Sequence, residues 1–361
     1  MDEAMESERI GKVKSEELNY VVDTVNSYIV TYEVHVSPVS IIFFYLDSDN
    51  PDFSTKFDQL RIALVDKGYI PFVRHDGENS ITVTKRPPVN YRSTKVNLVL
   101  FVLTLASTIY VGTIYSYPYA RSTLMQILYG FVFFSAPLML ILGLHELGHY
   151  FVAKHYHVKS SFPFFIPFPL TIGTFGAFIS LRDPIPNKRA MTEIGAAGPI
   201  VGFLTSLPLL FVADYFQSII KPVQNISSEF ILHYPIIYNL LGLHITNSGP
   251  IFPMVFFVWV GIFATAMNLL PVSQLDGGHI IRGVMGKAST YLGYVIVMAL
   301  IGIAFYFNYT GWLFLAIFVM FMGVAHPPAL DDYTKLRWLD ILIGLFALFM
   351  FIVSFTPVPI S

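Results

Sequence analysis

The chain has 361 residues and a formal net charge of −2; 54% of its residues are hydrophobic and only 13% are charged. Soluble domains carry about 25% charged residues, so this composition excludes a soluble globular protein and indicates a multi-pass protein of the lipid bilayer. No cysteine is present, which excludes disulfides and thiolate ligands and leaves histidine and carboxylate as the side chains for any metal. We expect no nucleic-acid partner.

Residues 1–92 differ from the rest of the chain, because they hold many of its charges and no apolar run long enough to cross a membrane. The expected elements are helices over residues 15–28 and 54–67 and strands over residues 29–36, 40–46, 70–74 and 80–85. Asp76-Gly77 is typical of a hairpin turn between the last two strands. The pattern predicts a small soluble α+β domain, and the polar N-terminus predicts no cleavable signal peptide.

Apolar segments follow, each near the ~20 residues that a helix needs to span the hydrocarbon layer. They cover residues 96–115, 124–153, 191–216, 251–270, 290–307, 312–325 and 338–355. We therefore expect residues 93–361 to form a transmembrane domain of about seven helices. Residues 217–249 are amphipathic and interrupted by proline, so we expect them on the outer surface.

Lysine and arginine are unevenly distributed between the two sets of polar segments that flank the apolar stretches, one set on each side of the membrane. The richer set holds Lys85, Arg86, Arg92, Lys95, Lys154, Lys159, Arg182, Lys188, Arg189, Arg282, Lys287, Lys335 and Arg337. The other set holds only Arg121 and Lys221. Because cytoplasmic flanks are enriched in these residues, the N-terminal domain and the loop after residue 153 are expected in the cytoplasm and the C-terminus outside.

The second apolar segment contains the sequence LHELGH at residues 144–149. On a helix, His145 and His149 lie one turn apart on one face, so both imidazoles can hold one zinc ion. Glu146 is then placed to act as a base on a zinc-bound water. Ionisable residues in so apolar a segment usually mark function, although the three side chains could instead only hydrogen-bond to neighbouring helices.

A zinc ion needs a further protein ligand, and the fourth apolar segment leads to two candidates. Asp276 lies in the sequence NLLPVSQLDGG at residues 268–278, and His279 comes three residues later. Pro271 and the two glycines predict a helix break, which is tolerated at membrane depth only where the backbone is packed in protein or lines a cavity. The segment descends in the same direction as the second one, so Asp276 is expected at the depth of the histidines, with His279 ranked second.

Together these motifs resemble the paired signature of the site-2 protease family of intramembrane metalloproteases. The residues that carry the resemblance are HELGH at 145–149 and N-x-x-P-x-x-x-L-D-G at 268–277. The segment G-P-x-x-G at 198–202 resembles the middle core helix of that family, and the resemblance covers residues 124–286. Residues 173–181 resemble the branch of archaea and chloroplasts, which lacks PDZ domains.

The resemblance implies roles for individual residues. His145, His149 and Asp276 would bind Zn²⁺, Glu146 would activate water, and Asn268 would handle the substrate strand. The substrate would be a transmembrane segment of another membrane protein, and the reaction hydrolysis of a peptide bond within it. The alternatives are a metal-ion transporter or sensor and a non-catalytic protease-like scaffold.

Residues 173–181 also have a physical interpretation. Small and β-compatible residues lie there between two proline-rich segments that disfavour a helix. A short β-hairpin near the active site could bind an unwound substrate segment along its edge. A plain loop on the membrane surface explains the same residues equally well.

Overall fold

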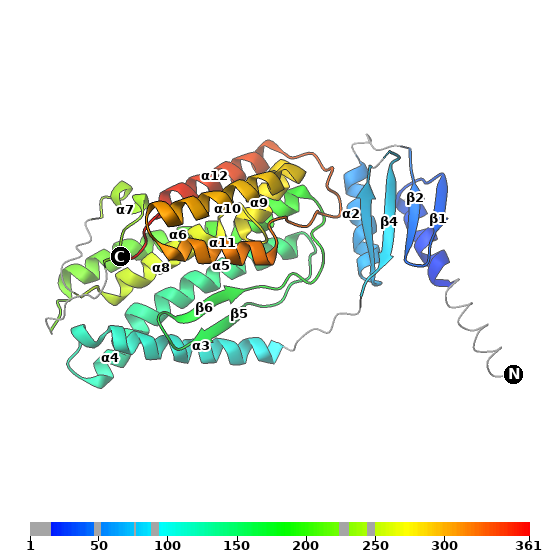
Figure 1. Ribbon diagram of the computed structural model, residues 1–361. Helices are drawn as coiled ribbons and strands as arrows, with labels where there is room; N and C mark the ends of the chain where they lie inside the picture. Colours follow the sequence, from blue (N-terminus) through cyan, green and yellow to red (C-terminus); the bar gives the residue numbers. More distant parts are fainter. Residues whose placement is uncertain (1–15, 47–51, 76, 88–93, 224–230, 244–249) are drawn as a thin grey trace. The chain divides into compact units, whose positions relative to one another are not determined.

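The structure is a computed structural model, and the chain divides into two compact units. It describes residues 16–46, 52–75, 77–87, 94–223, 231–243 and 250–361. The first unit comprises Met1–Tyr91 together with two short segments from later in the chain, Asp183–Asn187 and Pro328–Lys335, and the second comprises the remainder (Figure 1).

The first unit is built on a four-stranded antiparallel sheet with the order β1-β2-β4-β3. Its elements are β1 (Glu33–Val36), β2 (Ser40–Phe44), α2 (Phe53–Val65), β3 (Tyr69–Arg74), β4 (Ser80–Lys85) and a helix over residues 16–28. Alternate strand residues such as Phe43, Ile81 and Val83 share one core with Leu60 and Leu64 of α2. This confirms the small sheet region that the sequence predicts.

One expected strand begins later than predicted. Residues 29–32 were expected in the first strand, but the backbone N–H of Ile29 donates to Val25 and so extends the preceding helical turn. Val30 is 88% exposed, and the first strand begins only at Glu33. The turn at Asp76 lies outside the described residues.

Most of the second unit is helical. Its helices are α3 (Thr94–Tyr115), α4 (Thr123–Gly130), α5 (Ala136–His155), α6 (Lys188–Ile219), α7 (Ile236–Leu240), α8 (Pro253–Asn268), α9 (Asp276–Met285), α10 (Ser289–Tyr306), α11 (Thr310–Met322) and α12 (Trp338–Ser354). Four helical stretches of the described residues are long and apolar enough to cross a membrane: Thr94–Tyr115, Thr123–His155, Lys188–Ile219 and Asp276–Tyr306. The chain is therefore a membrane protein. The helices α8, α11 and α12 are apolar but shorter, so seven spans remain a prediction.

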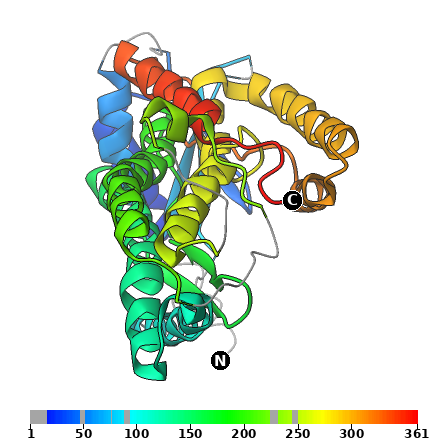
Figure 2. The same cartoon turned by 90° about the vertical axis from the view of Figure 1, so that its left-hand side faces the viewer.

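Helix α8 is the most enclosed of the apolar helices. Every residue from Pro253 to Ile262 is buried, as expected for a helix that is hydrophobic on all sides. Its side chains share one core with Leu138 of α5 and Phe203 of α6. By contrast, α10 and α11 pack on each other in a smaller core, and they lie to one side of α5 and α6 in Figure 2. The interior of the second unit is therefore formed by α5, α6 and α8.

The expected hairpin is present, formed by β5 (Phe164–Phe168) and β6 (Gly173–Phe178). It lies between α3 and α5 in Figure 1. The pairing is interrupted by a register shift between Phe165 and Pro167. There the buried Thr174 donates from its hydroxyl to Ile166 at 2.8 Å and accepts from the backbone of Gly176 at 3.0 Å, which links the two strands.

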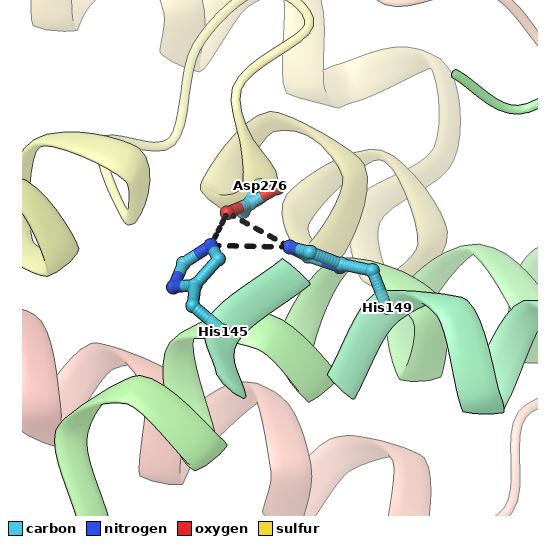
Figure 3. A group of neighbouring side chains, drawn as sticks. All are labelled: His145, His149 and Asp276. Atoms are coloured by element: carbon cyan, nitrogen blue, oxygen red, sulfur yellow. Dashed lines mark hydrogen bonds and ion pairs between the residues drawn. The ribbon is translucent and has the colours of Figure 1, made fainter. Parts of the chain in front are cut away.

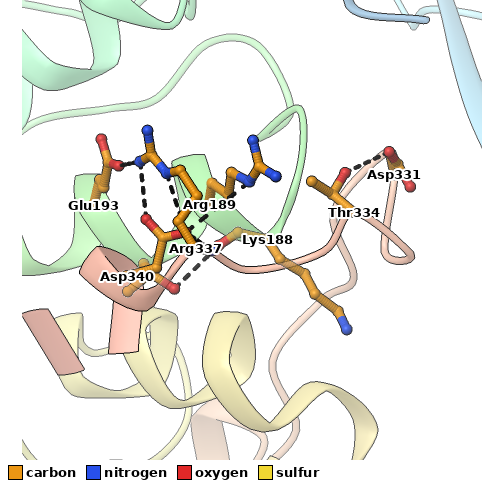
Figure 4. Close-up of polar contacts among 8 residues, drawn as sticks. Lys188, Arg189, Glu193, Asp331, Thr334, Arg337 and Asp340 are labelled. Carbon is orange, nitrogen blue, oxygen red and sulfur yellow. Dashed lines mark hydrogen bonds and ion pairs between the residues drawn. The ribbon is translucent and has the colours of Figure 1, made fainter. Parts of the chain in front are cut away.

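A charged cluster around the buried Asp340 ties the first turn of α12 to the first turns of α6 (Figure 4). Asp340 is completely buried, and its carboxylate accepts from the backbone of Arg337 at 2.7 Å and from its guanidinium at 2.9 Å. The same guanidinium pairs with Glu193 of α6. Since breaking a buried pair leaves an uncompensated charge, these contacts fix the start of α12 against α6.

Candidate metal centre

Helix α5 carries the two histidines in its C-terminal half. Pro137 is the second residue of the helix, which follows a π-helical turn over Phe131–Ser135 and then runs unbroken to His155. His145 and His149 face the same way, as their spacing predicts. They are buried, with 5% and 6% of their surface exposed, and their Nε2 atoms lie 3.2 Å apart.

Asp276 reaches the two rings from the start of α9. Helix α8 ends at Asn268, the chain turns over residues 269–275, and α9 begins at Asp276 itself. One oxygen of Asp276 lies 3.2 Å from Nε2 of His145 and 3.3 Å from Nε2 of His149, and the three side chains point toward one another in Figure 3. The break around Pro271 is as expected, but Gly277 and Gly278 lie within α9 rather than in the break.

The spacing of these donor atoms fits a single tetrahedral ion. Ligand atoms held about 2.0–2.1 Å from a tetrahedral zinc lie about 3.3–3.4 Å from one another, and the three separations here are 3.2–3.3 Å. Among the described residues, His145, His149 and Asp276 form the group that can hold a metal. A cation would also remove the repulsion between a carboxylate and two imidazole lone pairs aimed at the same point.

The tautomer of His149 supports this arrangement. Its Nδ1 lies 2.7 Å from the backbone oxygen of Ile194 in α6. A carbonyl oxygen only accepts, so Nδ1 carries a proton, and in the neutral ring this leaves the lone pair on Nε2, the atom that faces Asp276. Metal-binding histidines are usually oriented in this way by a second hydrogen bond.

Helix α6 approaches both histidines through glycine. At Gly198 a Cβ atom would overlap the imidazole of His149, and at Gly202 it would come within 3.0 Å of Nδ1 of His145. Any other residue would push the rings from their positions. The small residues that the sequence places in this helix are therefore the surface against which the two rings pack.

The other three predicted site residues, Glu146, Asn268 and His279, lie outside the group of three ligands. Glu146 is buried, and the backbone of Ile179, the residue after β6, lies beside its carboxylate. Asn268 places its amide nitrogen 3.5 Å from Nε2 of His145. His279 lies on α9 outside the ligand group; its Nδ1 is 3.1 Å from the oxygen of Leu275, and its ring packs at 4.3 Å against that of His326.

Sequence reasoning missed the backbone groups of Ile194 and Ile179. Both contacts involve main-chain atoms, so the identity of the side chain gives no signal for them. The one signal in the sequence is the small-residue segment at 198–202, because a close approach of its helix to HELGH would bring its backbone near the histidines.

Comparison with known proteins finds similarity to metal-dependent peptidases, in agreement with the metal centre. Residues 133–309 match the model of peptidase family M50. The chain is 28% identical over 292 residues to the probable zinc metalloprotease EGY1, chloroplastic, of Arabidopsis thaliana, covering 73% of this chain and 53% of that protein. It is 30% identical over 224 residues to the protein of the same name from rice, Oryza sativa subsp. japonica, covering 54% and 38%.

An archaeal relative shows the same likeness. The chain is 33% identical over 159 residues to the zinc metalloprotease MJ0392 of Methanocaldococcus jannaschii, covering 44% of this chain and 36% of that protein. The chain thus spans about half, or less, of the length of these curated relatives. Residues 133–309 include both motifs and all three converging side chains, and this part of the chain is similar to peptidase family M50, the site-2 protease family.

Proposed function

We propose that the chain is an intramembrane zinc metalloprotease that hydrolyses peptide bonds within transmembrane segments of membrane proteins. The observation that carries this proposal is the convergence of His145, His149 and Asp276 on one point, with Glu146 beside them. The names of the relatives, which are zinc metalloproteases, support zinc as the ion. In this proposal the protease domain is residues 93–361, with its catalytic core at about 124–286.

The chemistry divides between the ion and the chain. Zinc, when bound, would polarise the scissile carbonyl and lower the pKa of a water molecule. Glu146 accepts a proton as the oxygen of that water forms a bond to the carbonyl carbon. When the carbon–nitrogen bond breaks, Glu146 returns the proton to the departing amine. The amide of Asn268, whose nitrogen lies 3.5 Å from Nε2 of His145, would donate a hydrogen bond to the carbonyl oxygen of the substrate.

The hairpin gives the substrate a place to bind in an extended form. A helical carbonyl is already hydrogen-bonded within its helix, so the substrate must unwind before its peptide bond is open to attack. An edge of the β5–β6 hairpin can pair with the unwound segment. The contact between Ile179 and Glu146 supports this, because the residue that follows β6 touches the proposed base.

The distribution of Lys and Arg supports an orientation. We propose that the N-terminal unit and the loops near the metal centre face the cytoplasm, and that α8, α11 and α12 complete seven spans. Residues 217–249 would then lie outside. The segments 224–230 and 244–249 within this range are outside the described residues.

The test is cleavage by the purified protein. The detergent-purified chain is incubated with a generic membrane-helix substrate before and after treatment with a zinc chelator, and again after zinc is restored. Cleavage that is lost on chelation and returns with zinc is the expected result. A transporter or a scaffold would give no cleavage under any of the three conditions, and cleavage that persists without zinc would contradict the metalloprotease proposal.

A further inference from the structure

In the first unit, main-chain hydrogen bonds join the edge strand β3 to two segments from much later in the chain. β3 is the last strand of the sheet order, and the backbone N–H of Val73 donates to Leu330 at 2.9 Å. Leu330 in turn donates from its N–H to Ile185 at 3.0 Å. Main-chain pairing therefore runs from β3 to the segment Pro328–Lys335 and from there to the segment Asp183–Asn187. We call these two segments the linkers.

The linkers also pair with each other. The N–H of Asp331 donates to the oxygen of Pro186 at 2.8 Å, and Asn187 and Asp331 form a parallel bridge. The carboxylate of Asp331 accepts from the hydroxyl of Thr334 at 2.5 Å and from the backbone of Tyr333 at 3.0 Å, which closes the turn that follows (Figure 4). The linkers are thus hydrogen-bonded to each other and, through Leu330, to the outer edge of β3.

Side chains bind each linker to the N-terminal residues. Leu330 is 1% exposed and belongs to the same apolar core as the buried strand residues. The carboxylate of Asp183, whose side chain is 1% exposed, pairs with Arg86 at 2.7 Å. Tyr333 stacks on His75 with ring centroids 3.9 Å apart, and His75 contacts the hydroxyl of Tyr45 at 3.2 Å.

The linkers end where two helices of the second unit begin. Asn187 is followed directly by Lys188, the first residue of α6, and Lys335 lies three residues before Trp338, the first residue of α12. The starts of α6 and α12 are themselves joined by the cluster around Asp340 (Figure 4). Helix α6 then carries Ile194, Gly198 and Gly202 to the two histidines.

We propose that residues 1–91 are an integral brace of the protein and not a separable appendage. The N-terminal residues bind the two linkers through three non-covalent contacts. These are the hydrogen bond at the edge of β3, the apolar core around Leu330 and the ion pair with Asp183. By holding the linkers they hold the residues that immediately precede α6 and α12. The N-terminal residues therefore stay attached to the membrane helices when the connection after Tyr91 is cut.

The experiment cuts that connection in the folded protein. A specific protease sequence is inserted between Tyr91 and Arg92 in the full-length chain, the purified protein is cleaved, and an affinity tag on the C-terminus is used to test whether the N-terminal fragment is retained. Retention of nearly all the fragment is expected. Release of the fragment from the otherwise unchanged protein would overturn the proposal.

Matched variants show whether the linkers are responsible. Leu330→Asp places a charge in the core, so the cut fragment is expected to be released, whereas Leu46→Asp makes the same change at a residue that is 82% exposed and is expected to be retained. Arg86→Gln removes the ion pair while leaving the core intact, and at low salt, where the ion pair is least screened, it is expected to increase release several-fold over the wild-type chain cut in the same way. Retention of the Leu330→Asp fragment as complete as that of Leu46→Asp would overturn the proposal.

Discussion

The imidazole of His149 occupies the space that Gly198 leaves open on α6. A Cβ atom at residue 198 would overlap the ring at the nitrogen that faces Asp276. The carbonyl of Ile194, one turn earlier on the same helix, holds the other nitrogen of the ring at 2.7 Å. One short stretch of α6 therefore sets both the position of the ring and the nitrogen that is free to bind a cation.

The first prediction concerns this close approach. Gly198→Ala should displace the ring of His149 and lower zinc affinity by about 5- to 150-fold, because forcing a methyl group into a packed site costs about 1–3 kcal/mol. Zinc affinity measured by competition with a chromophoric chelator checks it. Gly302→Ala is the matched control, because no atom lies within 4 Å of a Cβ at that position in α10; equal affinity in the two variants would contradict the assignment.

The second prediction separates catalysis from metal binding. Glu146→Gln keeps the size of the side chain but cannot accept a proton, so cleavage should fall by about 10²- to 10⁴-fold while zinc content stays unchanged. Cleavage of a membrane-helix substrate and zinc content are measured on the same preparation. Cleavage at the wild-type rate would remove Glu146 from the role of base.

The third prediction concerns the hairpin. Thr174→Val keeps the shape of the side chain but loses the hydroxyl that joins the two strands, and a lost hydrogen bond of this kind costs about 1 kcal/mol or more. We expect kcat/KM to fall by roughly 5-fold or more at unchanged zinc content.

Thr205→Val is its control, because that hydroxyl bonds only to Val201 within α6 at 2.7 Å. If both variants cleave equally well, the hairpin does not take part in binding the substrate.

The fourth prediction tests the orientation in the membrane. The absence of cysteine allows single-cysteine variants to be labelled without background. With a maleimide that does not cross the membrane, Lys221→Cys should be labelled from outside in intact cells, and Val30→Cys, whose side chain is exposed, only after the cells are opened. Labelling of both from the same side would contradict the proposed number of spans.

Much of the molecule follows from the sequence because local patterns determine it. The spacing of His145 and His149 on a continuous apolar helix predicts two rings on one face, and Pro271 predicts the break that precedes Asp276. Alternation and turn residues predict β2, β3 and β4. In each case the signal lies within about ten residues of the structure that it predicts.

The rest depends on contacts between distant parts of the chain. Nothing in residues 183–187 or 328–335 indicates that they bind at the edge of β3, because main-chain pairing leaves no mark in the side chains. The same holds for the carbonyl of Ile194 at His149. Residues 29–32 have the composition of a strand, but the backbone N–H of Ile29 bonds to Val25 and so continues the last turn of the preceding helix.

The central claim is that His145, His149 and Asp276 hold one zinc ion, and the most direct test is the zinc bound per chain in three purified proteins. Wild type and His279→Ala should each bind close to one zinc, since His279 lies outside the ligand group, and Asp276→Ala should bind far less. Zinc that remains in Asp276→Ala but is lost from His279→Ala would contradict the account.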